Sequence, residues 1–271
     1  MHPLYDEVAS LLLDVAARAL MPRFGSLSLS DIFEKSPGEI VTVADQEAER
    51  LLIGGLARID PDARAIGEEA CSADLALLEG IGSGRAWLID PVDGTANFAA
   101  GRGPFGIMVA LVEDGDTVAS WILDPLEDRL CHAFAGHGAY IDGQRVTAQV
   151  RDHPLPIAAL ATQFMPHEQR QAFIDSASRT MAVVPIPRCA AEHYPRLTLG
   201  QNDIAFFQRT LPWDHAAGVL FLLEAGGAVC RWNGEPYRVD DGGVGLLAAN
   251  CEEHLAIMRN AMVSAVYSSA I

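Results

Sequence analysis

Two closely spaced aspartates are the first residues in the chain that could carry chemistry. Asp90 and Asp93 are three positions apart, and a glycine and a threonine follow them. The two carboxylates and the Val92 carbonyl between them are hard oxygen donors of the kind that Mg²⁺ prefers. Gly94 allows close backbone approach, and Thr95 can open a helical turn whose free N–H groups face an anion. The segment therefore predicts a metal site beside a phosphate site. An Asx-type turn, in which the aspartates only accept bonds from nearby N–H groups, is the alternative.

Two further carboxylates lie at the ends of predicted secondary-structure elements. Glu68 follows a short apolar segment, and Asp214 begins a strongly apolar helix that ends at Gly226. Considered alone, Glu68 could be a solvated surface charge, and Asp214 could be a helix cap. If both met Asp90 and Asp93, each pair of carboxylates ~4 Å apart would repel by about 4 kcal/mol at an effective dielectric constant near 20, so the cluster would require cations. Two magnesium ions would offset this repulsion and activate water for in-line hydrolysis of a phosphate monoester.

Five sequence blocks resemble the inositol monophosphatase family in order and spacing, and together they cover nearly the whole chain. The blocks are Val41-Thr42-x-Ala44-Asp45, Gly67-Glu68-Glu69, Trp87-x-Ile89-Asp90-Pro91-x-Asp93-Gly94-Thr95-x-Asn97-Phe98, Trp213-Asp214-x-Ala216-x-Gly218 and Glu224-Ala225-Gly226-Gly227. The resemblance implies a layered α-β-α-β-α sandwich of the carbohydrate phosphatase type. It also implies dependence on two or three magnesium ions and a homodimeric assembly.

The same resemblance assigns roles to individual residues. The metal ligands would be Glu68, Asp90, the carbonyl of Val92, Asp93 and Asp214. Thr95, Asp45 and Glu68 would be catalytic, since in the family the threonine hydroxyl, oriented by the aspartate, helps to position or activate the attacking water. Gly94 and Thr95 would bind the phosphate. No phosphoenzyme would form, and in agreement no cysteine here has an arginine six positions later.

Substrate recognition is where the chain departs from the family pattern. Members that cleave inositol phosphates usually carry Arg-Ser-x-Gly-Ser/Thr-Ala-Ala, whereas this chain has Arg188-Cys189-Ala190-Ala191-Glu192-His193-Tyr194. We predict that Arg188, Glu192 and Asp93 bind the substrate. For Glu192 and His193, a solvated first helical turn is the alternative.

A second departure lies before Trp213, where a hydroxyl-binding acid is expected but Gln208 and Arg209 stand. Arg209 could favour a second phosphate. Inositol phosphate, histidinol phosphate and sugar phosphates are therefore all open as substrates, and a nucleotide 3′-phosphate or a sugar bisphosphate is the second hypothesis. A non-catalytic metal- and phosphate-binding module is the third, although retention of Thr95 and Asp45 argues against it. Lys35, the only lysine in the chain, matches a family lysine beside a flexible metal loop.

Hydrophobic periodicity predicts the elements that position these residues. Helices are predicted from residue 4 to near Pro22 and Gly25 and from Thr42 to Asp60. β-Strands at 106–112, 118–123, 130–134 and 139–141 form an antiparallel meander, with hairpin turns at Asp114-Gly115 and Asp142-Gly143. From residue 157 onward strands at 158–162, 182–186, 204–207, 228–232 and 244–248 alternate with helices, and the segment 251–263 forms a closing helix. We therefore predict an α/β protein with an α+β half at 1–150, an α/β half at 151–271 and the metal site between them. Because Pro91 cannot continue a central ladder, Asp90 is expected at a strand end.

Composition narrows the class of partner. The formal net charge of −17 disfavours binding to nucleic acid or to an anionic membrane. The five cysteines are scattered and never form a C-x-x-C pair, so we expect neither a disulfide framework nor a zinc ribbon. No apolar run approaches about 20 residues, and Asp6 and Glu7 near the start are unlike a secretory signal. We therefore expect a cytoplasmic protein that acts on a small phosphorylated metabolite.

Overall fold

The computed structural model of the chain describes residues 4–36 and 38–268, with side chains as far as residue 262. A seven-stranded sheet contains, in the order of pairing, β3 (Arg64–Gly67), β4 (Arg85–Asp93), β5 (Gly106–Glu113), β6 (Asp116–Asp124), β7 (Arg129–Phe134), β8 (Gly138–Ile141) and β9 (Gln144–Val146). A five-stranded sheet contains, in the same manner, β11 (Ala182–Val184), β10 (Ile157–Ala161), β12 (Ile204–Phe207), β14 (Leu246–Ala249) and β13 (Ala228–Cys230). A separate hairpin is formed by β1 (Ile32–Ser36) and β2 (Glu39–Thr42).

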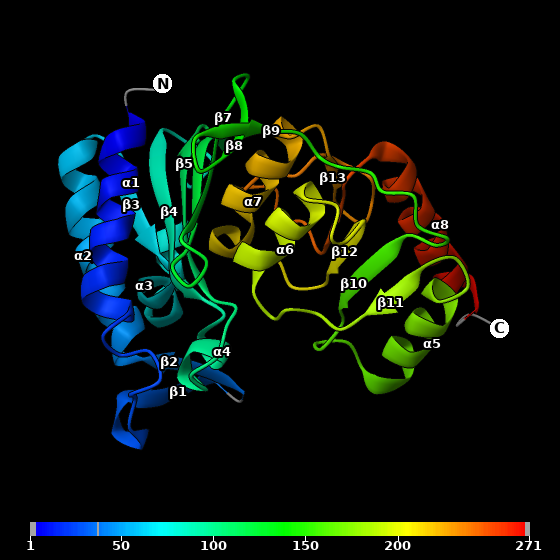
Figure 1. Ribbon diagram of the computed structural model, residues 1–271, viewed down its shortest axis with the longest axis horizontal. Coiled ribbons are helices and arrows are strands. Elements are labelled where there is room, and N and C mark those ends of the chain that lie inside the picture. The colour runs from blue at the N-terminus through cyan, green and yellow to red at the C-terminus, as the bar shows by residue number, and fades with distance from the viewer. Residues whose placement is uncertain (1–3, 37, 269–271) are drawn as a thin grey trace.

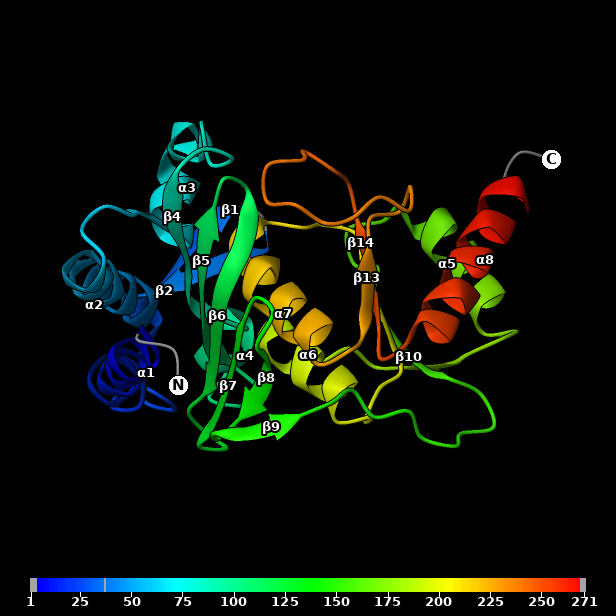
Figure 2. The ribbon, with the colours of Figure 1, turned by 90° about the horizontal axis from the view of Figure 1, so that it is seen from above.

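Helices cover both faces of each large sheet (Figure 1). The described helices are α1 (Leu4–Val15), α2 (Val43–Ile59), α3 (Glu68–Ala73), α4 (Thr95–Ala99), α5 (His167–Ala177), α6 (Ala190–Thr198), α7 (Pro212–Glu224) and α8 (Glu252–Ser268). In Figures 1 and 2, α1 and α2 lie outside the seven-stranded sheet, α6 and α7 lie between the two sheets, and α5 and α8 lie outside the five-stranded sheet. The α/β fold predicted from the sequence is thus confirmed.

Alternation of side chains along the strands divides the interior into three cores. On β4, Trp87 points into the core shared with α1 and α2, whereas Leu88 points into the core shared with α6 and α7. On β12, Phe207 joins that middle core, whereas Phe206 joins the third core with α5 and α8. Each sheet is therefore apolar on both faces, which explains why its central strands are nearly continuous runs of buried residues.

Two hairpins of the seven-stranded sheet turn at Asp-Gly pairs, as predicted. Asp114 and Gly115 join β5 to β6 with φ angles of +49° and +85°, and Asp142 and Gly143 join β8 to β9 with φ angles of +50° and +73°. Positive φ at both central residues is the conformation whose twist matches that of the flanking strands. The predicted antiparallel meander is confirmed by the pairing of β4 through β9.

One prediction about β4 was wrong. The strand does not end at Asp90 but continues through Pro91 to Asp93. Its register against β5 pairs Asp90 with Met108 and Asp93 with Gly106, so that two residues of β4 face one residue of β5. This β-bulge removes the need for a ladder N–H at the proline, and it turns the end of the strand. The predicted division near residue 150 lies in the connection between β9 and β10 and stays a prediction.

Candidate active site and metal centre

A cavity of about 760 Å³ opens where several helices begin. It is lined from the β1–β2 hairpin, the start of α3, the end of β4 with α4, and the starts of α6 and α7. Segments before residue 97 and after residue 160 therefore line the same pocket. The free N–H groups of helix starts make such a place favourable for negative charge.

Three of the predicted metal ligands meet in this cavity. Glu68, Asp90 and Asp214 each offer a carboxylate oxygen, and these oxygens lie within 4.8 Å of one another. Glu68 is the first residue of α3 and Asp214 lies in the first turn of α7, but the residue at the cap position of α7 is Leu211, so Asp214 does not cap that helix. Burial, followed by the charge of Glu68, raises the pKa of both Asp90 and Asp214. Such a group of carboxylates is suited to hold a divalent cation.

The β4 bulge directs the other predicted ligands toward the same cavity. Asp90 Oδ1 accepts a hydrogen bond from the Val92 N–H at 3.0 Å, so the Asx-type contact and the carboxylate cluster occur together. Asp93 differs, because its Oδ2 accepts a bond at 2.5 Å from the N–H of Ala191, far away in the chain. Burial raises the pKa of Asp93 to about 6. Asp93 and Val92 line the cavity but are not part of the three-carboxylate cluster.

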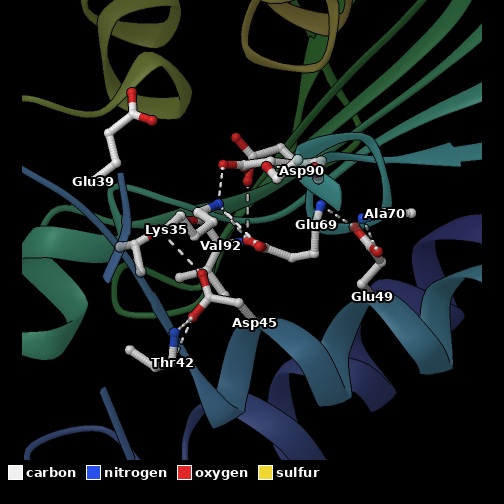
Figure 3. A network of polar contacts seen from close by, with 12 residues as sticks. Lys35, Glu39, Thr42, Asp45, Glu49, Glu69, Ala70, Asp90 and Val92 are labelled. Carbon is white, nitrogen blue, oxygen red and sulfur yellow. Dashed lines mark hydrogen bonds and ion pairs between the residues drawn. The ribbon is translucent and has the colours of Figure 1, made fainter. Parts of the chain in front are cut away.

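Thr95 and Asp45 are in contact, as the resemblance implies. The Thr95 hydroxyl lies 3.1 Å from Asp45 Oδ1 and 2.9 Å from the Val92 carbonyl oxygen, and its one proton can be donated to either. Asp45 Oδ2 accepts bonds from the N–H and the hydroxyl of Thr42 at 2.8 and 2.5 Å, which closes a capping box at the start of α2 (Figure 3). Burial raises the pKa of Asp45 to about 6.

Gly94 fits its position for a steric reason. Its φ angle is +84°, and a Cβ atom there would lie 2.9 Å from the carbonyl oxygen of Pro104 and 3.2 Å from Cys189. The glycine thus lets the chain turn sharply from β4 into α4, and Thr95 and Ala96 follow it along the cavity wall. Ala96 was not predicted as a site residue.

Lys35 reaches the cluster from the hairpin. Its ammonium lies 2.8 Å from Glu68 Oε1 and 2.9 Å from both carboxylate oxygens of Glu69 (Figure 3). Burial, and next the charge of Glu68, raise the pKa of Glu69 to about 8. Glu68 and Glu69 are therefore paired, partly buried groups rather than solvated charges.

The predicted substrate residues divide into two groups. Arg188 is exposed at the cavity wall, with a φ angle of +58°. Glu192 does not line the cavity, because its buried carboxylate pairs with Arg129 and, at 2.6 Å, with Arg196 Nε. Neither a substrate contact nor a solvated first turn therefore describes Glu192 in this structure. His193, the next residue, does line the cavity and is buried.

Three residues of the site and its surroundings were not predicted from the sequence, namely Glu39, Phe164 and Glu49. Gln208 and Arg209 line the cavity, and the guanidinium of Arg209 pairs with Glu39 of the hairpin and lies 4.4 Å from the centre of the Phe164 ring. Neither Glu39 nor Phe164 carries a local signal, since each lies more than 40 positions from Arg209. Glu49, which binds the start of α3, follows Asp45 by one helical turn, and this spacing could have indicated it.

Within the part of the chain that the structure describes, no helix is both long enough and apolar enough to cross a bilayer.

Comparison with known proteins gives a consistent result. The model of the inositol monophosphatase family matches residues 4–264. The inositol-1-monophosphatase of Bacillus subtilis is 30% identical over 237 residues, which are 86% of this chain and 87% of that protein. A fructose-1,6-bisphosphatase/inositol-1-monophosphatase of Aquifex aeolicus is 29% identical and covers 94% of each chain. Among solved structures, the IMPase of Thermotoga maritima superimposes with a TM-score of 0.79 at 26% identity, over 98% of this chain and 100% of that one.

Proposed function

Because the chain belongs to the inositol monophosphatase family, and is thus a metal-dependent phosphoric monoester hydrolase, we propose that its metal is Mg²⁺ and its substrate a small phosphorylated metabolite. The observation that carries the proposal is the meeting of Glu68, Asp90 and Asp214 within 4.8 Å at a cavity wall. Carboxylates this close repel one another strongly unless protons or cations lie between them.

The donor set fits magnesium. It consists of carboxylate oxygens and one backbone carbonyl, without sulfur or imidazole ligands, which is the chemistry that Mg²⁺ prefers. Two or three ions would be held by Glu68, Asp90, Asp214, Asp93 and the Val92 carbonyl. When bound, magnesium lowers the pKa of a coordinated water and stabilises the charge that develops on the phosphate.

The remaining roles belong to side chains and N–H groups of this chain. The Thr95 hydroxyl, held by Asp45 Oδ1 at 3.1 Å, orients the attacking water and passes a proton toward the aspartate. Gly94 and Thr95 present backbone N–H groups to the phosphate at the start of α4. Arg188 at the cavity wall contacts the alcohol part of the substrate. Water attacks phosphorus in line with the ester oxygen, the ester P–O bond breaks, and the alcohol leaves with inorganic phosphate as the other product, so no phosphoenzyme forms.

A sugar bisphosphate or a nucleotide 3′-phosphate with a second phosphate is a second candidate substrate. Arg188 and Arg209 both line the cavity, and guanidinium groups bind phosphate well. The name of the Aquifex aeolicus relative also includes a bisphosphatase activity. Against this, Arg209 is already paired with Glu39, which a second phosphate would have to displace.

Phosphate release with and without Mg²⁺ tests the proposal. The substrates are inositol phosphate, histidinol phosphate, fructose bisphosphate and adenosine 3′,5′-bisphosphate. We expect Mg²⁺-dependent release from at least one of them and loss of turnover in Asp93→Asn, which keeps an acceptor for the Ala191 N–H and therefore the fold. Hydrolysis without Mg²⁺, or full activity of the variant, would contradict the proposal. Preference for the two bisphosphates would favour the second candidate.

Three broader expectations stay predictions. From the family we propose a homodimer, which sedimentation would test. A cytoplasmic location and the division into halves near residue 150 likewise stay predictions.

A further inference from the structure

A buried glutamate outside the cavity binds the helix that carries Glu68. Glu49 lies on α2, and its side chain is only 6% exposed. Its Oε2 accepts a hydrogen bond from the Glu69 N–H at 2.8 Å, and its Oε1 accepts one from the Ala70 N–H at 3.0 Å (Figure 3). These N–H groups belong to the first turn of α3, where no residue within the helix can accept from them. Both oxygens of one carboxylate thus hold the backbone directly after Glu68.

We propose that Glu49 is a positioning residue for the metal ligand Glu68. Glu68 begins α3, so its backbone moves with the turn that Glu49 fixes. Two bonds from one rigid carboxylate restrain both the position and the rotation of this turn, whereas a single bond would leave rotation free. Groups that orient a ligand without touching the metal typically change metal affinity by about 10–100-fold when they are mutated.

The residue before Glu68 gives independent support. A Cβ atom at Gly67 would lie 2.2 Å from Glu49 Oε2. The φ angle of Gly67 is −101°, so the backbone conformation itself does not require glycine. The missing side chain is therefore explained by the space that the Glu49 carboxylate occupies.

Helix α2, which carries Glu49, also carries Asp45, the partner of Thr95. Asp45 and Glu49 are four positions apart on α2 and lie on one face of it. Asp45 contacts Thr95, and Glu49 contacts the turn of Glu68. One helix face therefore fixes the water-positioning hydroxyl and a metal ligand relative to each other.

The test is the variant Glu49→Gln with Glu47→Gln as its matched control. The amide has only one acceptor oxygen, and its NH₂ group would face one of the two N–H donors. We expect the Mg²⁺ concentration for half-maximal activity to rise about tenfold or more, with kcat at saturating Mg²⁺ within about threefold of the parent. The Mg²⁺ concentration needed to raise the thermal unfolding midpoint should shift by the same factor. Glu47 is bonded only to Arg50 in the described structure, so its variant should leave both values unchanged.

A second set of variants separates positioning from general loss of stability. Gly67→Ala should raise the Mg²⁺ requirement like Glu49→Gln, because the added methyl displaces the carboxylate. In a Glu49→Ala background the same methyl meets no carboxylate, so Gly67→Ala should add little there. An unchanged Mg²⁺ requirement in Glu49→Gln, or an equal effect of Gly67→Ala in both backgrounds, would overturn the inference.

This inference rests on the proposed Mg²⁺ site, and its failure can be told apart from failure of that proposal. If the parent protein neither binds nor needs Mg²⁺, the proposed function is wrong. If the parent needs Mg²⁺ but the Glu49 and Gly67 variants bind it like the parent, only the role of Glu49 is wrong.

Discussion

Asp45 uses its two carboxylate oxygens for different tasks. One oxygen accepts from Thr42 and completes the start of α2, and the other lies beside the Thr95 hydroxyl. A residue that caps a helix start is thereby fixed in the orientation that the proposed mechanism requires. Among the described residues no cation pairs with Asp45, and hydrogen bonds from Thr42, with the Thr95 hydroxyl beside the other oxygen, offset part of the desolvation cost of this buried carboxylate.

The hydroxyl of Thr95 can be tested by a pair of substitutions. Thr95→Ala removes the group that we propose orients the attacking water, so kcat should fall by roughly 10²-fold or more. Thr95→Ser keeps the hydroxyl and should retain most of the activity. Steady-state phosphate release at saturating Mg²⁺ measures both. The assignment fails if the alanine variant stays within about threefold of the serine variant.

Short-range patterns made part of the site predictable. Asp90, Asp93 and Thr95 lie within six positions, so their common location follows from the chain itself. Glu192 was predicted to bind substrate, but in the structure it does not line the cavity and pairs with Arg129, which is 63 positions away. No local pattern distinguishes such a buried ion pair from a substrate contact. Glu39 and Phe164 could not be predicted for the same reason, since only the tertiary fold brings them to Arg209.

At the scale of elements, close approach between α6 and α7 depends on a glycine. A Cβ atom at Gly218 of α7 would lie 1.9 Å from a ring carbon of Tyr194 on α6, and that ring is fully buried. Tyr194 also bonds His215 at 2.8 Å, which limits how far it can move. The two helices fill the space between the sheets, so their packing fixes the position of Asp214 in the first turn of α7.

Two glycine-to-alanine substitutions should have opposite effects on stability. Gly218→Ala forces the Tyr194 ring aside and should lower the free energy of unfolding by about 1–3 kcal/mol. Gly54→Ala, in the interior of α2, meets nothing closer than the guanidinium of Arg58 at 3.8 Å. It should raise that free energy by about 0.5–1 kcal/mol, because alanine has less freedom to lose in a helix. Urea unfolding measures both values, and a Gly218→Ala variant as stable as the parent would contradict the packing described for α7.

The elements were predictable to different degrees. The Asp-Gly pairs predicted the hairpin turns correctly, because the positive φ angles of these turns are largely restricted to a few residue types. The end of β4 was placed wrongly because a β-bulge, which has no sequence signal of its own, accommodates Pro91. The predicted strands at 228–232 and 244–248 correspond to β13 and β14, but β13 ends at Cys230 and β14 begins at Leu246.

At the scale of the whole molecule, three acidic side chains from distant parts of the chain meet at one site. Glu68 comes from α3, Asp90 from β4 and Asp214 from α7. Without cations these carboxylates repel one another across the pocket, so they oppose the docking of α7 against β4. A cation bound between them would connect α7 to β4 and α3.

Metal binding should therefore stabilise the whole fold, and more strongly at higher pH. Burial raises the pKa of Asp45 and Asp93 from 3.8 to about 6, so their contribution to stability is present below pH 3.8 and is lost as pH rises through about 6. Mg²⁺ would bind the ionised form of Asp93, one of the proposed ligands, and would offset its share of this loss. At a concentration 100 times its dissociation constant it would add about 2.7 kcal/mol to the free energy of unfolding.

The measurement is the difference in unfolding midpoint with and without Mg²⁺, at pH 5 and at pH 8. Burial lowers the pKa of His132 to about 4 and of His215 to about 3, so their contribution is present above pH 6.5 and is lost as pH falls. These histidines affect the samples with and without Mg²⁺ alike, and the difference between the samples cancels them. We expect a clearly larger Mg²⁺ increment at pH 8 than at pH 5, and a smaller increment at pH 8 in Asp93→Asn. An equal increment at both pH values would show that the buried carboxylates are not the groups that bind the metal.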